Sequence, residues 1–591
     1  MNKLPDTALA MDPGDDSAGA HHAGDAPLPP DLEARRDQMF PTLLPAEIDR
    51  LRRFGKVRTW QPGELLFQAG APGPGMFVLL RGHIAVTRKN ALSEAAPIVE
   101  YERGQFMAEV GQLSGRPALV DGLAVGVVEA LLIDPPSLRA LVVAEAELGE
   151  RIMRALILRR VGLIETGAGG PVLIGAPGTA DLVRLQGFLS RNGHPHTVLD
   201  PALEHSAEEV MRLHAPRADE LPLVVCPDGT VLKRPSELEL ARRLGLLPAL
   251  SADHVYDAAI VGAGPAGLAA AVYAASEGLS VLVFDTRVIG GQAGASARIE
   301  NYLGFPTGIS GQALAGRAFV QAQKFGAEVA VPVAVTRIDC ACSPRALYLD
   351  CGTRLSAKTV IIATGAKYRR PEIAELDKYE GRGIYYWASP IEAKLCRHEE
   401  VVLVGGGNAA GQAVVFLASH AAHVHLLIRG ADLAKGMSSY LVERIVSLAN
   451  VTLHVETEIV AFEGGDDGLR SVRWRKRTSG MQETKPIRRV FLFVGADPNT
   501  GWLANCGVKL DDKGFVCTGS ELARDEFQTQ VQAQRPRQPL PLETTVSGVF
   551  AIGDARAGST KRVAAAVGEG AAVVAQVHAW LAAHEHQAAR V

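Results

Sequence analysis

The 591-residue chain has 61 basic and 65 acidic residues, a formal charge of −4, and its length predicts about three or four domains. With 47% hydrophobic and 21% charged residues it has the composition of a folded globular protein, which excludes a collagenous or wholly disordered chain. The balanced charge predicts no nucleic-acid partner. Seven scattered cysteines exclude a disulfide scaffold, and no uncharged apolar run reaches the roughly eighteen residues that span a bilayer. We therefore predict a cytoplasmic protein without a membrane partner.

Residues 1–38 are predicted to be a disordered leader. Most of this segment is Ala, Asp, Gly, His and Pro with few large apolar residues, so burial there cannot offset the entropy lost on ordering. It also lacks the apolar segment of a signal peptide. The pair His21 and His22 is more often solvated than metal-binding in such a tail, so no metal site is expected.

Residues 39–168 are predicted to form a β jelly roll followed by a helix, because short β runs punctuated by glycines precede a helical stretch from about Ser137. The run M-F-V-L-L-R-G-H-I-A-V, followed by G-Q-F-M-A-E, resembles the cyclic nucleotide-binding domain. The resemblance implies that Glu109 meets a ribose hydroxyl and that Arg116 is the candidate partner of a cyclic phosphate. However, Arg116 stands one residue early, and Pro117 lacks the N–H expected there. Two hypotheses stay open, a cyclic-nucleotide site and a degenerate sensor used for docking.

Residues 169–250 read as β-α-β followed by β-β-α, an order that resembles the thioredoxin and glutaredoxin fold. In that family the active dithiol follows the first strand, where this chain has G-A-P-G. Cys226 lies inside an apolar strand and is expected to be a buried small side chain. We interpret this α/β domain as a scaffold without a dithiol that serves partner docking. It stands where a transcription factor would carry a helix-turn-helix, which argues against DNA binding.

A glycine fingerprint follows a buried strand in Y-D-A-A-I-V-G-A-G-P-A-G-L. Gly262, Gly264 and Gly267 permit the turn, the close approach of a pyrophosphate and helix packing, and the helix N-terminus then faces the anion. The next strand ends in Asp285, the acid expected to accept a hydrogen bond from a ribose hydroxyl. This context predicts a Rossmann-like site for a dinucleotide.

A second fingerprint occurs about 140 residues later, in V-V-L-V-G-G-G-N-A-A-G-Q-A. Gly405 and Gly407 occupy the first two glycine positions and Ala410 the third. Its second strand ends in Arg429 instead of an acid, which favours NADPH over NADH. Two sites in one chain predict two three-layer α/β domains, one for a flavin and one for a nicotinamide dinucleotide.

Four further motifs accompany the fingerprints: G-G-Q at 290–292, E-N-Y-L-G-F at 300–305, A-T-G at 363–365 and G-V-F-A-I-G-D at 548–554. Together they make residues 254–585 resemble thioredoxin reductase and related flavoproteins. The resemblance implies a homodimer and a FAD domain split into 254–370 and 492–585, with the NAD(P) domain, 371–491, inserted. It assigns FAD to Gly262, Gly264, Pro265, Ala266, Gly267, Asp285, Gly291, Gln292, Asn301, Thr364, Gly365, Gly553 and Asp554, and NAD(P) to Gly405, Gly407, Asn408, Ala409 and Arg429.

One departure from that family changes the predicted chemistry. Thioredoxin reductases carry a C-A-T-C dithiol shortly before the second fingerprint, but this chain reads G-I-Y-Y-W-A-S-P, with Trp387 and Pro390 in place of the cysteines. Disulfide exchange needs an attacking thiolate and a resolving thiol, which neither residue supplies. Cys396 is a candidate one-thiol centre if Arg397 lowers its pKa; a packed helical cysteine is the alternative. Trp387 is the other candidate at the reacting position.

The sequence thus predicts a FAD-dependent oxidoreductase that takes hydride from NADPH or NADH and passes electrons to an unidentified acceptor. The acceptor classes left open are a ferredoxin-like protein, a quinone, a disulfide protein reached through Cys396, and oxygen. The alternative is a non-catalytic redox sensor in which flavin reduction or nucleotide occupancy changes the contacts made by the segment before the first glycine fingerprint.

Overall fold

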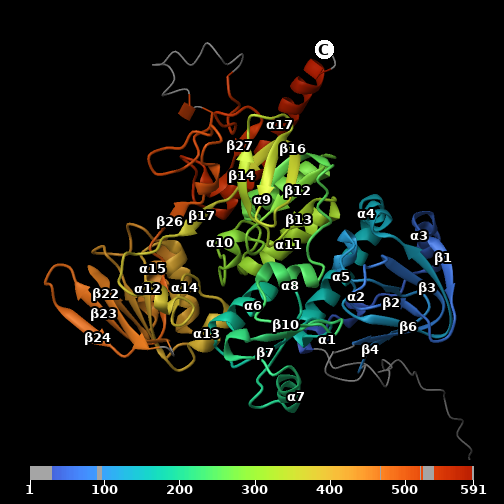
Figure 1. The fold of residues 1–591 in the computed structure, drawn as a ribbon, viewed down its shortest axis with the longest axis horizontal. Helices are drawn as coiled ribbons and strands as arrows, with labels where there is room; N and C mark the ends of the chain where they lie inside the picture. Colours follow the sequence, from blue (N-terminus) through green and yellow to red (C-terminus); the bar gives the residue numbers. More distant parts are fainter. Residues whose placement is uncertain (1–28, 89–95, 466–467, 520, 523–537, 589–591) are drawn as a thin grey trace, which may run out of the picture.

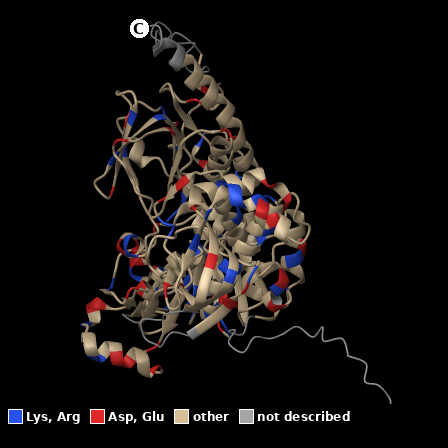
Figure 2. Cartoon of the chain, turned by 90° about the vertical axis from the view of Figure 1, so that its right-hand side faces the viewer, with Lys and Arg blue, Asp and Glu red and all other residues tan. Residues whose placement is uncertain are grey.

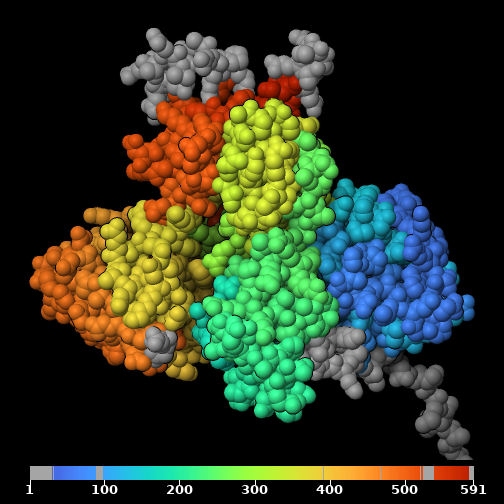
Figure 3. All heavy atoms as spheres, viewed as in Figure 1, coloured from blue at the N-terminus to red at the C-terminus, as the bar shows by residue number. Residues whose placement is uncertain are grey.

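The computed structural model describes residues 29–88, 96–465, 468–519, 521–522 and 538–588. In Figure 1 an amino-terminal lobe, drawn in blue, and an orange lobe lie at opposite ends of the long axis. The green segments lie between them. The space-filling view shows the green part in contact with its neighbours on both sides (Figure 3), and Figure 2 shows acidic and basic residues intermingled along the chain.

The predicted disordered leader is too long. Residues 1–28 lie outside the described part of the chain, but residues 30–39 form two short helices, α1 (Pro30–Glu33) and α2 (Arg36–Met39). Leu32 and Met39 are buried against Leu158 of the long helix α5 (Ala146–Thr166). The segment is ordered because two apolar side chains find a partner far along the chain, which local composition does not reveal.

The amino-terminal lobe is an antiparallel sheet covered by helices. Strand order runs β1-β6-β3-β4, with β2 paired to β6 and β5 to β3. The longest strands, β3 and β6, bend at bulges near Arg81. The strands are β1 (Lys56–Trp60), β2 (Leu65–Phe67), β3 (Met76–Arg88), β4 (Ala96–Tyr101), β5 (Phe106–Met107) and β6 (Asp121–Ile133), with α3 (Pro45–Leu51), η2 (Val110–Ser114), α4 (Pro135–Ala144) and α5.

The second part, within residues 169–250, is a four-stranded sheet in the order β10-β9-β7-β8. Strands β7 and β8 are parallel and the other pairs are antiparallel. Cys226 is 2% exposed and packs with Leu173 and Phe188 in the core, as expected for a buried thiol. The elements are β7 (Val172–Ile174), α6 (Ala180–Arg191), β8 (Thr197–Leu199), α7 (His205–His214), β9 (Leu223–Val225), β10 (Val231–Lys233) and α8 (Glu237–Arg243).

The third part is built on a sheet whose strands β13, β12, β11, β16 and β27 run parallel. Strand β27 comes from near the end of the chain, long after β16 in the sequence, so two distant segments complete one sheet (Figure 1). Helices α9, α11 and α17 bury one face, and β14 with β15 contributes to the core on the other. The elements are β11 (Val255–Val261), α9 (Pro265–Ser276), β12 (Val281–Phe284), α10 (Gly291–Gly294), α11 (Gly311–Lys324), β13 (Glu328–Ala330), β14 (Val335–Asp339), β15 (Arg345–Leu349), β16 (Arg354–Ile362), β27 (Val549–Ala551) and α17 (Val563–Ala588).

One described segment, Val563–His584 of α17, has the length and hydropathy of a membrane-spanning helix. Val573, Val574 and Val577 of this segment are buried in the core shared with α9. This part of the apolar surface of the helix therefore packs against the rest of the chain.

The fourth part is also built on a parallel sheet, in the order β18-β25-β19-β20-β21, with a layer on each face. Helices α14 and α15 cover one face, and an antiparallel sheet, β22-β23-β24, covers the other. The predicted boundary between residues 491 and 492 falls inside β25. The elements are β17 (Ala366–Tyr368), α12 (Leu376–Tyr379), β18 (Ile384–Tyr385), α13 (Pro390–Leu395), β19 (Glu400–Val404), α14 (Asn408–Ala418), β20 (His423–Leu427), α15 (Ser439–Ser447), β21 (Val451–His454), β22 (Thr457–Gly465), β23 (Gly468–Lys476), β24 (Gln482–Lys485), β25 (Val490–Leu492) and β26 (Ala496–Pro498).

Candidate functional site

The turn between β11 and α9 brings three backbone segments together. Gly262 has a φ of 118°, and a Cβ there would lie 2.1 Å from the carbonyl oxygen of Ala363. A Cβ on Gly267 would lie 1.8 Å from the carbonyl oxygen of Gly262. Only glycine fits either position. The turn therefore places the N-terminus of α9, where amide N–H groups lack helical partners, at the edge of a cavity.

Two adjoining cavities, of about 310 and 390 Å³, meet beside this turn. Both are lined by Asp285, Thr364 and Trp387. Gly553 packs against Ala266, which lines one of the cavities: a Cβ built at Gly553 would lie 2.9 Å from the Cβ of Ala266. The structure thus brings these predicted flavin residues to the walls of one or both cavities: Gly262, Gly264, Pro265, Ala266, Asp285, Gly291, Gln292, Asn301, Thr364, Gly365 and Asp554.

Asp285 links the turn to the loop that follows β12. One carboxylate oxygen accepts a hydrogen bond from the backbone N–H of Ala263 at 2.9 Å. The other accepts from the N–H groups of Arg287 at 3.1 Å and Val288 at 3.4 Å. Burial raises the pKa of Asp285 and the hydrogen bonds oppose that rise. The carboxylate is thereby fixed at the cavity wall where the sequence predicts a ribose.

The residues present fit a bound dinucleotide. Thr364 lines both cavities. Its hydroxyl is buried and has no hydrogen-bond partner among the described residues. Buried polar groups are usually hydrogen-bonded, so a ligand in the cavity would supply the partner. At the other end, Lys561 Nζ donates to the backbone carbonyl of Asp554 at 2.7 Å. Burial raises the pKa of the Asp554 carboxyl. A glycine-lined wall and a helix N-terminus fit the pyrophosphate of a dinucleotide, and the unpartnered hydroxyl offers it a hydrogen-bonding group.

The second fingerprint faces the same cavity. Helix α14 begins at Asn408, and Asn408 and Ala409 line the cavity that Gly264 also lines. The Asn408 side-chain oxygen accepts a hydrogen bond from the N–H of Ser438 at 2.8 Å, which fixes the end of α14. Gly405 and Gly407 do not line either cavity. Arg429, just after β20, is exposed and lies outside both cavity walls.

Trp387 lies where the two cavities meet. Its indole N–H donates to Glu392 at 3.1 Å, and the guanidinium carbons of Arg287 and Arg191 lie 5.7 and 6.0 Å from its ring centroid. Tyr368, which the sequence did not single out, lines both cavities with it. Trp387 and Tyr368 therefore give both cavities an aromatic wall.

The surroundings of Cys396 favour the packed helical cysteine over the reactive thiol. The side chain is fully buried in the core of the fourth part, and burial raises the pKa of its thiol to about 12. The cation that opposes this rise is Arg489, not Arg397. Burial in an apolar core favours the protonated thiol, which is a weaker nucleophile than the thiolate. Cys396 is a packing residue.

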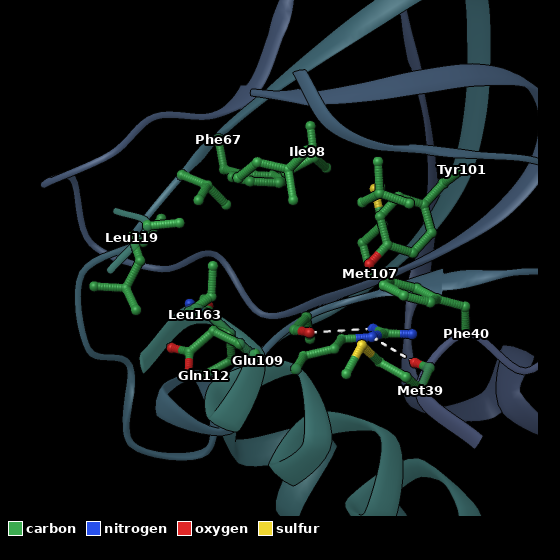
Figure 4. Close-up of a pocket in the computed structure, with 18 of the residues that line it drawn as sticks. Met39, Phe40, Phe67, Ile98, Tyr101, Met107, Glu109, Gln112, Leu119 and Leu163 are labelled. Carbon is green, nitrogen blue, oxygen red and sulfur yellow. Dashed lines mark hydrogen bonds between the residues drawn. The ribbon is translucent and has the colours of Figure 1, made fainter. Parts of the chain in front are cut away.

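Glu109 and Arg116 are not brought to one ligand site. Glu109 lines a cavity of about 140 Å³ in the amino-terminal lobe, where Figure 4 shows Phe67, Ile98, Met107 and Leu163 around a largely apolar space. One Glu109 carboxylate oxygen accepts a hydrogen bond from Arg160 at 3.1 Å. Arg116 lies outside the cavity wall.

Arg116 and its neighbours contact other parts of the chain instead. The guanidinium carbon of Arg116 lies 5.0 Å from the ring centroid of Phe319 on α11. Gln323 of the same helix donates to the Ser114 hydroxyl at 3.0 Å. These contacts use the segment that the resemblance assigned to a cyclic phosphate as a packing surface.

Comparisons with known proteins agree with the site. The family model of the pyridine nucleotide-disulphide oxidoreductases matches residues 256–570. The chain belongs to this family. A cyclic nucleotide-binding domain matches residues 57–145, so the oxidoreductase carries such a domain at its amino-terminal end.

The similar proteins include thioredoxin reductases. The thioredoxin reductase of Mycoplasmopsis pulmonis is 30% identical over 322 residues, which is 54% of this chain and 96% of the relative. A subunit of the alkyl hydroperoxide reductase of Escherichia coli is 30% identical over 54% of this chain and 56% of its own length. A crystal structure of Lactococcus lactis thioredoxin reductase aligns with 26% identity and a TM-score of 0.49, over 55% of this chain and 99% of that one. The family match and the sequence relatives make the chain a FAD-dependent oxidoreductase with a thioredoxin reductase-like dinucleotide-binding fold.

Replacing Gly264 by valine should weaken the binding of FAD to the oxidoreductase. The added side chain would narrow the cavity beside Gly291, whose Cα lies 4.0 Å from a Cβ built at Gly264. We expect FAD affinity to fall by about ten- to a hundredfold, the effect of overpacking, measured by flavin titration of the apoprotein. Gly316→Ala, in α11 with open space around the new methyl, is the control and should keep its FAD. Equal affinities in both variants would contradict this placement of the cofactor.

Proposed function

We propose that this oxidoreductase takes hydride from NADPH and passes electrons to an acceptor other than thioredoxin. The observation that carries the proposal is Trp387, an aromatic residue at the meeting point of the two cavities. The resemblance to thioredoxin reductases implies a cysteine at this position of the sequence. None of the seven cysteines lines either cavity. Without a dithiol there, the chain has no thiol shuttle between the cofactor and a protein disulfide.

Bound FAD would supply hydride acceptance and electron release. The chain's own residues bind and orient the reactants. The N-terminus of α9 would hold the diphosphate of a bound dinucleotide and Asp285 would accept a hydrogen bond from its ribose, while the N-terminus of α14 borders the same cavity. Trp387 covers the cavity and excludes water, which favours a flat or one-electron acceptor such as a quinone or a ferredoxin-like protein.

We further propose that the two amino-terminal parts, residues 39–168 and 169–250, regulate the oxidoreductase or dock a partner protein. The sheet order β10-β9-β7-β8 supports a thioredoxin-like fold for residues 169–250, and the antiparallel sheet of the first lobe supports a jelly roll. The second candidate function, a redox sensor without turnover, is favoured by the contact between α6 and the cavity wall. A homodimer and a cytoplasmic location stay predictions.

The acceptor assay tests the proposal. Purified enzyme with NADPH should reduce a small quinone or ferricyanide steadily and should leave thioredoxin disulfide oxidised, because no thiol reaches the cofactor site. Cys396→Ser should change neither rate, since the thiol is buried. Rapid thioredoxin reduction that vanishes in Cys396→Ser would overturn the proposal, and reduction of the flavin without turnover of any acceptor would favour the sensor.

NADPH should reduce the enzyme faster than NADH in anaerobic stopped-flow measurements. Arg429 is exposed at the end of β20, where a guanidinium can pair with a 2′-phosphate. We expect Arg429→Ala to slow reduction by NADPH by about tenfold and to leave NADH unaffected. Arg475→Ala, another exposed arginine of the same part, is the control. Equal rates with both nucleotides, unchanged by Arg429→Ala, would refute the preference.

Cyclic AMP and cyclic GMP should bind weakly or not at all. Glu109 is paired with Arg160, and the two arginines that line the apolar cavity have other partners. Arg36 pairs with Glu33, and Arg159 donates to the carbonyls of Met39 and Ala108. We expect dissociation constants above about 1 mM by calorimetry, weaker than about −4 kcal/mol. A micromolar constant that Glu109→Ala abolishes would establish a working nucleotide site.

A further inference from the structure

Arg191 enters the flavin cavity from outside the flavin-binding part of the chain. It is the last residue of α6 in the second part, and it lines the cavity that Asp285 and Thr364 also line. Its Nη2 donates to the carbonyl oxygen of Gly291 at 3.0 Å. Its Nε is buried and has no hydrogen-bond partner among the described residues. A donor of the second part is therefore present and unused at the wall of the cofactor site.

Residues on either side of Arg191 hold it there. The Asn192 side-chain oxygen accepts a hydrogen bond from the N–H of Ile289 at 3.3 Å, and the Asn192 amide nitrogen donates to the carbonyl of Arg287 at 3.2 Å. Gln312 of α11 donates to the Ser190 carbonyl at 2.7 Å. The consecutive residues 190–192 thus bind the loop and helix that border the cavity, so the position of Arg191 does not depend on its own contact alone.

The charge of Arg191 has no carboxylate partner within ion-pair distance in the part of the chain that the structure describes. Burial lowers the pKa of its guanidinium, and the cation of Arg287 lowers it further, yet an arginine keeps its charge at neutral pH. The carboxylate of Asp285, in the same cavity wall, already accepts three backbone hydrogen bonds. A half-buried cation without an anion is costly, and the cost falls when an anion occupies the cavity.

We propose that Arg191 is a cofactor-binding residue that the amino-terminal half of the chain contributes to the flavin site, as a counter-charge for the diphosphate of FAD. The inference rests on the proposed function, because it requires FAD in this cavity. Gly291, whose carbonyl Arg191 binds, faces Gly264 at the N-terminus of α9, the end of the helix that attracts a diphosphate. A planar guanidinium suits that group because it offers several donors in a fixed geometry.

The same segment is tied to the amino-terminal lobe. Arg160 of α5 donates through Nε to the carbonyl of Gly193 at 3.0 Å and through Nη1 to Glu109 at 3.1 Å. Gly193 follows Asn192 directly. Binding of FAD to Arg191 therefore stabilises a contact surface shared by three parts of the chain, and by linkage, docking of the second part tightens FAD.

The test measures FAD affinity and docking separately in the full chain. Flavin titration of the apoprotein should give a dissociation constant about ten- to a hundredfold weaker in Arg191→Ala, the range expected on loss of a charged hydrogen-bonding group. Arg191→Lys, which keeps the charge and loses the planar donors, should lie between Arg191→Ala and the wild type. Hydrogen exchange of residues 188–193 should slow when FAD is added to the wild type, and this slowing should be smaller in Arg191→Ala.

Two controls make the outcome specific. Arg212→Ala removes an exposed cation from α7 of the same part and should leave FAD affinity unchanged. Asn192→Ala removes docking hydrogen bonds but keeps the cation, so its effect on FAD should be smaller than that of Arg191→Ala. Folded Arg191→Ala that binds FAD as tightly as the wild type would overturn the inference, as would an equal loss in Asn192→Ala. Failure of the wild type to bind FAD at all would instead overturn the proposed function.

Discussion

Close approach of backbone to backbone at the β11–α9 turn is the constraint on which the flavin site depends. Neither Gly262 nor Gly267 has room for a side chain. Helix α17 also lies close to α9: a Cβ built at Gly570 would be 2.4 Å from the carbonyl oxygen of Ala266. This tight packing holds the N-terminus of α9 open to the cavity. Strand β27 must return beside β16 to support it, so the site exists only when segments far apart in the sequence assemble.

Trp387 gives an aromatic surface to the place where the two cavities meet. Trp387 stands on the segment between β18 and α13 and is anchored by Glu392, itself buried. An indole offers packing surface and exclusion of water, but no bond that can be exchanged with a disulfide. The family fold is therefore compatible with a different acceptor, and function follows from the site and not from the fold.

The amino-terminal lobe shows how residues of a ligand cassette can serve packing. Pro117 contacts Gly245 so closely that a Cβ at Gly245 would lie 2.4 Å from the proline ring. Glu109, Arg116 and Ser114 each contact a residue outside the sheet. Charged groups withdrawn from water need such partners, and here the partners come from α5 and α11.

The sequence by itself determined whatever depends on neighbours along the chain: both glycine fingerprints, the acid at the end of β12, and the alternation of strands and helices. Each is local, because turn geometry and strand or helix periodicity are set by adjacent residues. Tertiary structure alone decided the rest. The helices at 30–39 form against Leu158, Cys396 loses its reactivity by burial, and Arg191 reaches Gly291 from a different part of the chain. Burial and charge pairing arise from contacts between distant segments, and no local pattern encodes them.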